Sequence, residues 1–291
     1  MFRLRDQVSR RGYNYGIFGF HCVRCLPSPG NYLCSPRRSA SPFAKALRLT
    51  NPLIRKLENV AELSADERAV LQKLCERPRS VPANQDILTE GERPDFVHLI
   101  LEGWAIRYNI LPNGSRQITA LLIPGDFCDL HVMVLQRMDH SIATLGPAKV
   151  AYIPIKEVIE LTRQLPELSQ ALWWVTLVDE AILRAWIVNL GRRSGFERAG
   201  HLMCEMYDRM NNVGLVHGEE FDLPLTQIEI ADALGLTPVH MNRVIGRLRK
   251  ENLISFKQEK LTIPDIDRLK AISGFDPGYL HAEHVRVHGS A

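Results

Sequence analysis

The amino-acid sequence predicts an α+β fold with three successive parts: a small antiparallel β-roll, one long helix, and a C-terminal pair of short helices followed by a hairpin. Three observations predict it. Short β-branched and aromatic runs, separated by turns that contain glycine, follow one another between residues 86 and 154. A nearly continuous apolar run with a helical period follows Pro166. Two capped helical segments joined by a glycine turn lie between residues 226 and 254.

Composition places the chain among ordinary globular proteins. Its 291 residues carry a net charge of +3, and 45% of them are apolar. The charge is uneven, because residues 1–50 hold nine Arg and Lys against one Asp (+8), which leaves −5 for the remainder. Any basic surface beyond residue 50 is therefore local. The sequence has neither the roughly eighteen uninterrupted apolar residues of a membrane span nor a secretory signal, so we expect a cytoplasmic protein without membrane contact.

The N-terminal residues differ from the rest of the chain. Residues 1–45 show no sustained period and are punctuated by Pro, Gly and Ser, which predicts a disordered extension. From Pro52 the pattern predicts two short helices, the second capped by Ser64 with Glu67 completing a capping box. The six cysteines have irregular spacing and do not suggest a disulfide framework.

Residues 52–165 contain the predicted roll. Its strands are expected in the segments DILTEGE, FVHLILEGWAIRYNI, RQITALLIPGDF, SIATL and KVAYIP. Glycines such as Gly91, Gly103 and Gly125 punctuate these segments where turns are needed. Short strands at nearly regular spacing are typical of a small antiparallel barrel or roll.

Residues 166–193 are predicted to form a long helix and a hinge. The segment ELSQALWWVTLVDEAILRAWIVNL is apolar around most of its circumference, so it must bury two faces. One face would pack on the roll and the other on a second copy of the chain, which makes this helix the expected homodimer seam. A core helix of a monomer is the alternative. The residues assigned to dimerisation are Leu168, Leu172, Val175, Ile182 and Trp186, beside a second stripe of Trp174, Val178, Ala181, Ala185 and Val188.

The segment TQIEIADALGLTPVHMNRVIGRLRKENLI predicts two helices joined by a tight turn. Thr226 caps the first helix, and Glu229 completes its capping box. Thr237 caps the second helix, and Pro238 takes its first position. The positions expected to pack the two helices together are Ala231, Gly235, Met241 and Val244, with Ile245 and Leu248 completing the inward row.

The second of these helices keeps a basic side free of that packing. A short glycine turn followed by a basic helix makes a helix-turn-helix, whose second helix enters the major groove of DNA. Arg243 suits guanine and Asn242 suits adenine, whereas Val239 can contact only a thymine methyl. Basic side chains further along suit phosphates. The segment LISFKQEKLTIP predicts a hairpin wing. The residues assigned to DNA contact are Thr237, Val239, His240, Asn242, Arg243, Arg247, Arg249, Lys250 and Lys257.

In the order of its parts, and in the segments LTQIEIADALGLTPVHMNRVIGRLRKENLI and EGWAIRYNILPNGSRQITALLIPGDF, the chain resembles the Crp/Fnr family of bacterial transcription regulators. The resemblance spans about residues 52–272 and includes NLGRRSGFERAGHLMCEMYDRM, similar to the hinge and first helix of the family's C-terminal domain. It implies a roll like a cyclic-nucleotide-binding domain, a dimerisation helix, a winged helix-turn-helix over residues 194–272 and a flexible tail over residues 273–291. It also implies a homodimer that binds a palindromic operator in double-stranded DNA under the control of a signal, contacts RNA polymerase and catalyses no reaction.

Several positions depart from the family pattern. The family's recognition helix often has a Glu where this chain has Val239 and an Arg at the place of Arg243, so the arginine contact is kept while the usual half-site is in doubt. Members that bind cyclic nucleotides place a Glu on the ribose and an Arg on the phosphate, at the positions of Leu130 and His140 here. Because a buried phosphate without that guanidinium lacks its strongest partner, the signal is not expected to be a cyclic nucleotide.

Three N-terminal cysteines, Cys22, Cys25 and Cys34, resemble the group that holds a [4Fe-4S] cluster in oxygen-sensing Fnr members. Such a cluster takes four thiolates. Ala151 stands where those members draw the fourth from the roll, and Cys128 would substitute only if the N-terminal arm folded over it. We therefore expect no cofactor, with an Fnr-like oxygen or redox sensor as the alternative.

Two other classes of function compete with a transcription regulator. An enzyme is disfavoured because the sequence has no Gly-rich phosphate loop, no GxSxG and no HExxH motif. A small-molecule receptor, whose roll binds the ligand and whose helical domain docks on proteins, is a second alternative. The histidines His98, His131 and His140 lack metal-ligand spacing, so no metal site is predicted.

Overall fold

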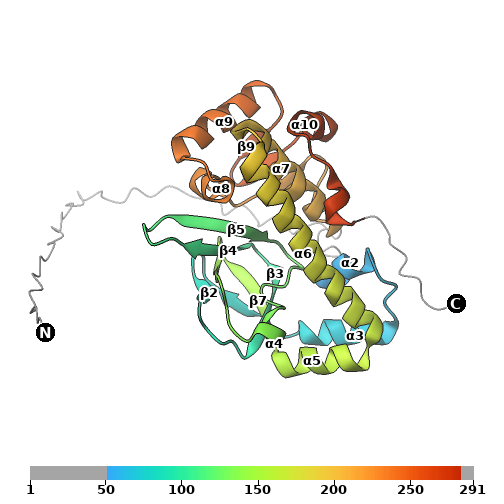
Figure 1. Ribbon diagram of the computed structural model, residues 1–291. Helices are drawn as coiled ribbons and strands as arrows, with labels where there is room; N and C mark the ends of the chain where they lie inside the picture. Colours follow the sequence, from blue (N-terminus) through green and yellow to red (C-terminus); the bar gives the residue numbers. More distant parts are fainter. Residues whose placement is uncertain (1–50, 283–291) are drawn as a thin grey trace, which may run out of the picture. The chain divides into compact units, whose positions relative to one another are not determined.

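A computed structural model describes residues 51–282 of the chain (Figure 1). The predicted α+β fold is confirmed: a β-roll is followed by a long helix and then by a helical domain with a small sheet. The predicted disordered extension over residues 1–45 and the last part of the predicted tail, residues 283–291, lie outside the described residues.

Two short helices precede the roll. α2 spans Pro52–Glu58, and α3 spans Ala65–Leu74. The predicted capping box of α3 is present: the Ser64 hydroxyl accepts a hydrogen bond from the Glu67 amide, and the Glu67 carboxylate accepts one from the Ser64 amide at 2.8 Å. The start of α3 was therefore readable from its sequence.

Two antiparallel sheets form the roll, with strand orders β1-β7-β3 and β2-β6-β4-β5. The first strand lies outside the predicted segments, because three residues are too few to show a period. The strands are β1 (Arg79–Val81), β2 (Asp86–Leu88), β3 (Phe96–Glu102), β4 (Ala105–Ile110), β5 (Arg116–Leu122), β6 (Ser141–Thr144) and β7 (Ala148–Pro154).

Glycine is required at two corners of the roll. Gly103 has a φ of +80°, and a Cβ there would lie 2.6 Å from the Pro147 carbonyl oxygen. Gly125 has a φ of +94°, and a Cβ there would lie 2.8 Å from the Pro52 carbonyl oxygen. Both positions combine a left-handed backbone with a close approach of another chain segment, which other residues accommodate poorly.

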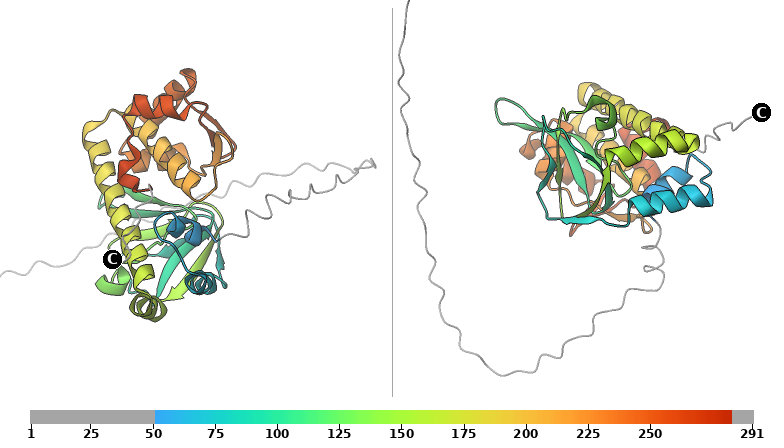
Figure 2. Two further views of the ribbon diagram at one scale, coloured as in Figure 1. Left: turned by 90° about the vertical axis from the view of Figure 1, so that its right-hand side faces the viewer. Right: turned by 90° about the horizontal axis from the view of Figure 1, so that it is seen from below.

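A short and a long helix follow the roll. After the four-residue α4 (Val132–Leu135) between β5 and β6, α5 spans Ile155–Gln164 and α6 spans Pro166–Arg192. Figures 1 and 2 show α6 running past the roll to the helices of the C-terminal domain. Within residues 51–282, no helix combines the length and apolar character needed to cross a bilayer.

The assignment of the dimer seam was wrong in its residues. The five side chains assigned to it are at most 6% exposed, because they pack on the chain's own roll and C-terminal domain, and a second copy cannot reach them. The second stripe is also partly used, since Val178 and Ala181 are buried. The residues withdrawn from the predicted seam are Leu168, Leu172, Val175, Ile182 and Trp186. The large apolar side chains that α6 leaves exposed are Trp173, Leu177, Leu183, Ile187 and Val188.

The C-terminal domain combines helices with a three-stranded sheet of order β8-β10-β9. The predicted wing is the β9–β10 hairpin, and β8, which pairs with β10, is a third strand that the sequence pattern did not indicate. Its elements are α7 (Gly195–Asn212), β8 (Glu220–Asp222), α8 (Gln227–Leu234), α9 (Pro238–Lys250), β9 (Ser255–Lys257), β10 (Lys260–Thr262), α10 (Ile266–Ser273) and the 3₁₀ helix η1 (Pro277–Leu280).

A continuous apolar core joins the roll to the C-terminal domain. It contains Trp104 and Ile106 of the roll, Trp186 of α6, and Leu202 and Met241 of α7 and α9. Since α9 is packed into this core, its orientation is fixed through α7 and α8 relative to the roll.

The flexible tail predicted over residues 273–291 is wrong for its first part. Phe275 and Leu280 are buried, and the rings of Phe275 and Tyr279 pack on His201 of α7. The Tyr279 hydroxyl also donates a hydrogen bond of 2.8 Å to Glu205. Aromatic burial and this hydrogen bond hold η1 on α7, although four residues give no periodic signal in the sequence.

Candidate nucleic-acid interface

The turn between α8 and α9 has the geometry that its sequence predicts. Thr226 and Glu229 form a complete capping box at the start of α8. Gly235 ends α8 with a φ of +61°, in the left-handed region that glycine adopts without strain. Ala231 is fully buried within the shared core, where a small side chain lets α8 and α9 approach.

The second helix, α9, is fixed at its start and along one side. The Thr237 hydroxyl accepts a hydrogen bond of 3.2 Å from the amide of His240, and Pro238 occupies the first turn. The inward row is buried, with Met241 and Leu248 at 0% exposure and Val244 and Ile245 at no more than 5%. The opposite side therefore has a defined orientation.

All nine side chains assigned to DNA contact are exposed. Eight of them lie on α9 or at its cap, and Lys257 lies at the end of β9 in the wing. α9 itself carries no acidic residue. A capped helix with one buried side and one exposed basic side, beside a hairpin, is the arrangement that places side chains in a DNA groove.

The exposed side chains differ in how far their own chain engages them. The Asn242 amide donates to the Gln227 side chain at 2.9 Å. The Arg247 guanidinium pairs with Glu251 at 2.7 Å and lies 4.0 Å from the centre of the Phe196 ring. By contrast, Arg243 makes no hydrogen bond or ion pair with any residue of the described range 51–282. Arg243 is thus the arginine of α9 that is ready for an external acceptor.

Sequence reasoning missed two residues that support this surface. Gln227 follows the cap of α8 and holds Asn242, and Phe196 at the start of α7 stacks on Arg247. Gly195, next to Phe196, faces His240, whose Nε2 atom would lie 2.8 Å from a Cβ at that position. Gln227 had a signal in its place directly after the capping Thr226, whereas contacts across 50 residues leave no periodic trace.

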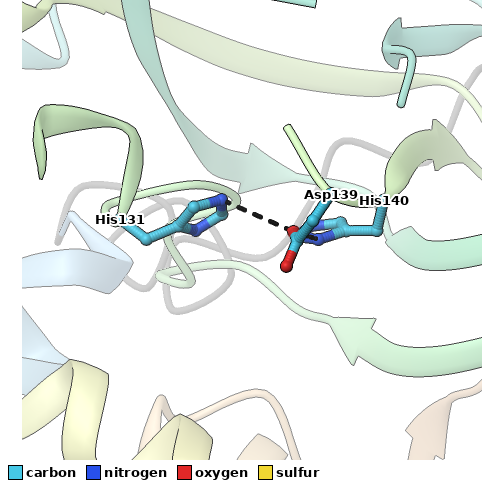
Figure 3. A group of neighbouring side chains, drawn as sticks. All are labelled: His131, Asp139 and His140. Carbon is cyan, nitrogen blue, oxygen red and sulfur yellow. Dashed lines mark hydrogen bonds and ion pairs between the residues drawn. The ribbon is translucent and has the colours of Figure 1, made fainter. Parts of the chain in front are cut away.

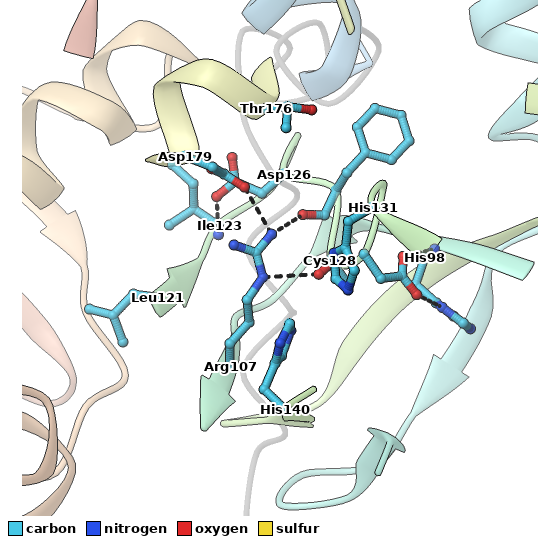
Figure 4. Close-up of polar contacts among 12 residues, drawn as sticks. His98, Arg107, Leu121, Ile123, Asp126, Cys128, His131, His140, Thr176 and Asp179 are labelled. Carbon is cyan, nitrogen blue, oxygen red and sulfur yellow. Dashed lines mark hydrogen bonds and ion pairs between the residues drawn. The ribbon is translucent and has the colours of Figure 1, made fainter. Parts of the chain in front are cut away.

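A polar cluster in the roll links it to α6. The Arg107 guanidinium donates to the carbonyl oxygens of Phe127 and Cys128, and it pairs with Asp179 of α6 at 2.9 Å (Figure 4). Burial is the largest single influence and lowers the pKa of Arg107, but the charge and hydrogen bond of Asp179, with smaller contributions from Cys128 and Asp126, together outweigh it and raise the pKa above its usual value. Arg107 therefore remains a cation and holds α6 to the roll.

The roll positions that were considered for an iron–sulfur cluster or a cyclic nucleotide are mostly buried. Cys128 is fully buried in the roll, and burial raises the pKa of its thiol well above the usual value, so it is not a ready thiolate. Leu130 and Ala151 are buried, and His140 lies just before β6. The other cysteines of the alternative cluster site, Cys22, Cys25 and Cys34, lie outside the described residues. The cysteines Cys75 and Cys204 are buried and free.

Comparison with known proteins bears on both halves of the chain. A family model described as a cyclic nucleotide-binding domain matches residues 78–164, and one described as a Crp-like helix-turn-helix domain matches residues 197–272. The chain belongs to the Crp/Fnr family of transcription regulators. It is 27% identical over 220 residues to the transcriptional activator protein FnrL of Cereibacter sphaeroides. The matched region covers 74% of this chain and 88% of that protein. It is also 27% identical over 214 residues to the electron transport regulator A of Shewanella oneidensis, covering 73% of this chain and 84% of that protein.

Solved structures of Crp/Fnr regulators share the fold. FixK2 from Bradyrhizobium japonicum superposes with a TM-score of 0.61 at 21% identity, over 67% of this chain and 96% of that one. A CRP/FNR-family regulator from Thermus thermophilus superposes with a TM-score of 0.51 at 22% identity, over 68% of this chain and 98% of that one. The Crp/Fnr family consists of transcription regulators rather than enzymes, and the Crp-like helix-turn-helix is its DNA-binding part.

Proposed function

We propose that this Crp/Fnr regulator binds a palindromic operator as a homodimer and reads it with α9. The observation that carries the proposal is Arg243, an exposed guanidinium without a partner among residues 51–282, on a helix whose other side is buried and capped. A free planar guanidinium matches the O6 and N7 acceptors of guanine.

The proposed roles of the other residues follow their engagement. Asn242 would have to leave Gln227 before pairing with adenine, so it contributes less than Arg243. Val239, 63% exposed at the start of α9, meets a thymine methyl and selects weakly. The remaining basic side chains of α9 and the wing contact phosphates, which position the helix without reading sequence. This last group comprises His240, Arg247, Arg249, Lys250 and Lys257, and Thr237 supports it through the helix cap.

Homodimerisation is proposed through the outer face of α6. Trp173, Leu177 and Ile187 are 65%, 53% and 69% exposed and recur with the spacing of a heptad seam, at positions 173, 177, 180, 184 and 187. The two charged positions between them, Glu180 and Arg184, pair with each other at 3.0 Å. Large apolar side chains that repeat along the exposed side of one helix are typical of a protein–protein interface. A parallel pair of α6 helices would present two α9 helices related by a two-fold axis.

The proposed signal is not a cyclic nucleotide. Leu130 and His140 stand where Crp/Fnr members that bind cyclic nucleotides place their Glu and Arg. Three of the five N–H donors of the nearby Arg107 are engaged, by two backbone carbonyls and by Asp179, whose carboxylate would compete with a phosphate for this guanidinium. The relatives named above are activators and electron-transport regulators. By analogy with FnrL we propose that this chain activates transcription through RNA polymerase.

Selection of bound duplexes from a random-sequence library, followed by affinity measurement on the selected operator, tests the proposal. Arg243→Ala should weaken operator binding about 5- to 150-fold for each half-site, the equivalent of about 1–3 kcal/mol per lost contact, and relax the preference at one base position per half-site. Arg268→Ala is the matched control, since Arg268 is an exposed arginine on α10 of the same domain. Equal affinity and equal base preference of wild type and Arg243→Ala would contradict the proposal.

A further inference from the structure

Three side chains with metal-ligating atoms converge in the roll. His131 lies directly before α4, and Asp139 and His140 lie directly before β6 (Figure 3). One ligand atom from each residue lies within 4.8 Å of those of the other two. Sequence spacing argued against a metal site, because His131 and His140 are nine positions apart; the loop around α4 returns the chain and closes that gap.

Both imidazoles have a buried nitrogen without a hydrogen-bond partner. The Nε2 atoms of His131 and His140 are inaccessible to solvent and unpaired among residues 51–282. Asp139 satisfies the other side of one ring, since its carboxylate accepts from His140 Nδ1 at 2.6 Å, and it lies 3.9 Å from His131 Nε2. A buried polar atom without a hydrogen-bond partner costs about 1–3 kcal/mol, so the Nε2 atom of His131, which faces the Asp139 carboxylate, calls for a missing ligand.

Asp139 lies next to both rings of the cluster. An imidazole coordinates a metal ion through the lone pair of an unprotonated nitrogen. The Asp139 carboxylate oxygen lies 2.6 Å from His140 Nδ1 and 3.9 Å from His131 Nε2, so these three atoms are the candidate ligands, and an incoming ion would displace the proton that His140 Nδ1 and Asp139 share.

We propose that His131, His140 and Asp139 bind a divalent first-row transition metal ion, of the Zn²⁺ or Fe²⁺ type, in the roll. Two imidazoles and a carboxylate are the donor set that these ions favour over Mg²⁺ or Ca²⁺. In a tetrahedral site with bonds of about 2.1 Å, neighbouring ligand atoms lie about 3.4 Å apart. The 3.9 Å between His131 Nε2 and Asp139 would therefore shorten by about 0.5 Å on binding, and the 2.6 Å between His140 Nδ1 and Asp139 would lengthen by about 0.8 Å. The Asp139 side chain is 78% exposed, which leaves the site open to water or a small molecule on that side.

The site adjoins the contact between the roll and α6. Figure 4 shows the rings of His131 and His140 beside the Arg107 side chain, whose guanidinium pairs with Asp179 of α6. A bound dication places two positive charges near Arg107, and their repulsion acts on the contact that holds α6 to the roll. Metal binding is therefore positioned to alter the geometry of the proposed dimer helix, and this coupling rests on the proposed function. The binding site itself does not.

The test is equilibrium dialysis of the full chain against Zn²⁺, with metal content measured by mass spectrometry and with Co²⁺ as an optical probe. Cys22, Cys25 and Cys34 are replaced by Ser in every sample, so that N-terminal thiolates do not compete. This parent protein should take up one more Zn²⁺ per chain than its His131→Gln/His140→Gln variant, and only the parent should show visible Co²⁺ bands of low coordination number. Asp139→Asn should bind about 10- to 100-fold more weakly. His217→Ala, a substitution of an exposed histidine, is the matched control and should match the parent.

Equal zinc content and affinity in the parent and the double variant would overturn the proposal. A second measurement does not depend on the variant's folding: Zn²⁺ should raise the thermal unfolding midpoint of the parent, because a ligand that binds the folded state stabilises it. A folded parent whose midpoint is unchanged at saturating Zn²⁺ would equally overturn it. Both measurements are made without DNA, so their failure leaves operator binding untouched.

Discussion

The Arg116 guanidinium on β5 lies 2.9 Å from the Asp232 carboxylate on α8, so the roll holds the first helix of the helix-turn-helix directly. The neighbouring Gln117 side chain donates to the Ala233 carbonyl oxygen at 3.4 Å. β5 and α8 thus share an ion pair and a hydrogen bond, next to the apolar core that also joins the two domains.

A double-mutant cycle on this pair should show a small but real coupling. The Arg116 and Asp232 side chains are 33% and 23% exposed, so water screens their attraction. Each single substitution to Ala should lower the free energy of unfolding by no more than about 1 kcal/mol, and the double substitution should cost less than the sum. Urea unfolding measures the cycle, and amide exchange on α8 should quicken in all three variants. Strictly additive costs would show that the pair does not couple the domains.

The parts of the fold that the sequence predicted are those with local signals. The capping boxes at Ser64 and Thr226, the left-handed glycine at position 235 and the inward row of α9 are set by residues within one or two turns. The three-residue strands β1 and β8 were missed, because they exist through pairing with β7 and β10. The same reason hid η1, which is held on α7 by contacts with His201 and Glu205.

The sites followed the same division. The exposed basic side of α9 was predictable, since caps and periodicity orient a helix from its own sequence. Which side of α6 faces outward was not, because both of its faces are apolar and only tertiary packing decides between them. The cluster of His131 and His140 was missed because a loop brings them together, and a fixed ligand spacing exists only within one helix or turn.

Asp126→Asn should be among the most destabilising single substitutions in the chain. Its buried carboxylate pairs with Lys56 of α2 and with Arg209 of α7, each at 2.6 Å. It therefore joins these two helices to the loop that follows β5. Burial alone would raise the pKa of Asp126, but the two cations and the Ile123 amide outweigh it and lower it. Removal of the charge leaves Lys56 and Arg209 uncompensated, at a cost of about 3–5 kcal/mol.

Chemical denaturation of Asp126→Asn measures this loss. Glu102→Gln is the control, because it removes a carboxylate from an ion pair with Lys149 in which the two side chains are 64% and 48% exposed, and it should leave the free energy of unfolding unchanged within error. Because the folded pKa of Asp126 is depressed, its contribution is complete above the unfolded pKa and is lost as the pH falls through the lower folded value. Similar stabilities of the two variants would contradict this assignment.

His201 should make the protein less stable between neutral and mildly acidic pH. Burial, with a smaller effect of Arg193, lowers the pKa of His201 from 6.5 to about 4. Above pH 6.5 the imidazole is neutral in both states. As the pH falls toward 4, the unfolded chain takes up a proton that the folded chain refuses, so the free energy of unfolding declines by up to about 3 kcal/mol.

Urea unfolding of wild type and His201→Gln at several pH values isolates this effect. The variant should be less stable than wild type at pH 8, because the substitution removes the packing of His201 on Phe275. Its free energy of unfolding should depend less steeply on pH between 6.5 and 4. Parallel pH profiles for the two proteins would show that His201 does not titrate in this window.

Charge on the outer face of α6 should dissociate the proposed homodimer. Leu177→Glu and Ile187→Glu place carboxylates in an apolar seam between two copies, where their desolvation is unfavourable. Analytical ultracentrifugation should give a dimer for wild type and a monomer for either variant. Because the operator is palindromic, loss of the dimer should also lower the affinity for the operator. Val134→Glu, at a 76% exposed valine on α4, is the control and should remain a dimer. A dimeric Leu177→Glu/Ile187→Glu double variant would place the seam elsewhere.

Lys257 and Arg243 should separate by their dependence on salt and on sequence. Lys257 lies at the end of the wing, and its proposed phosphate contact is the same on every duplex. Lys257→Ala should therefore weaken operator and random duplex alike, and it should reduce the slope of log affinity against log salt by about 0.9 for each lost contact, or about 2 for a homodimer. Arg243→Ala should instead reduce the ratio between operator and random duplex, because the contact it removes reads a base. Lys73→Ala, at an exposed lysine on α3, should leave both the slope and the ratio unchanged. A loss of sequence preference in Lys257→Ala, with an unaltered salt slope, would reverse the roles proposed for the wing and for α9.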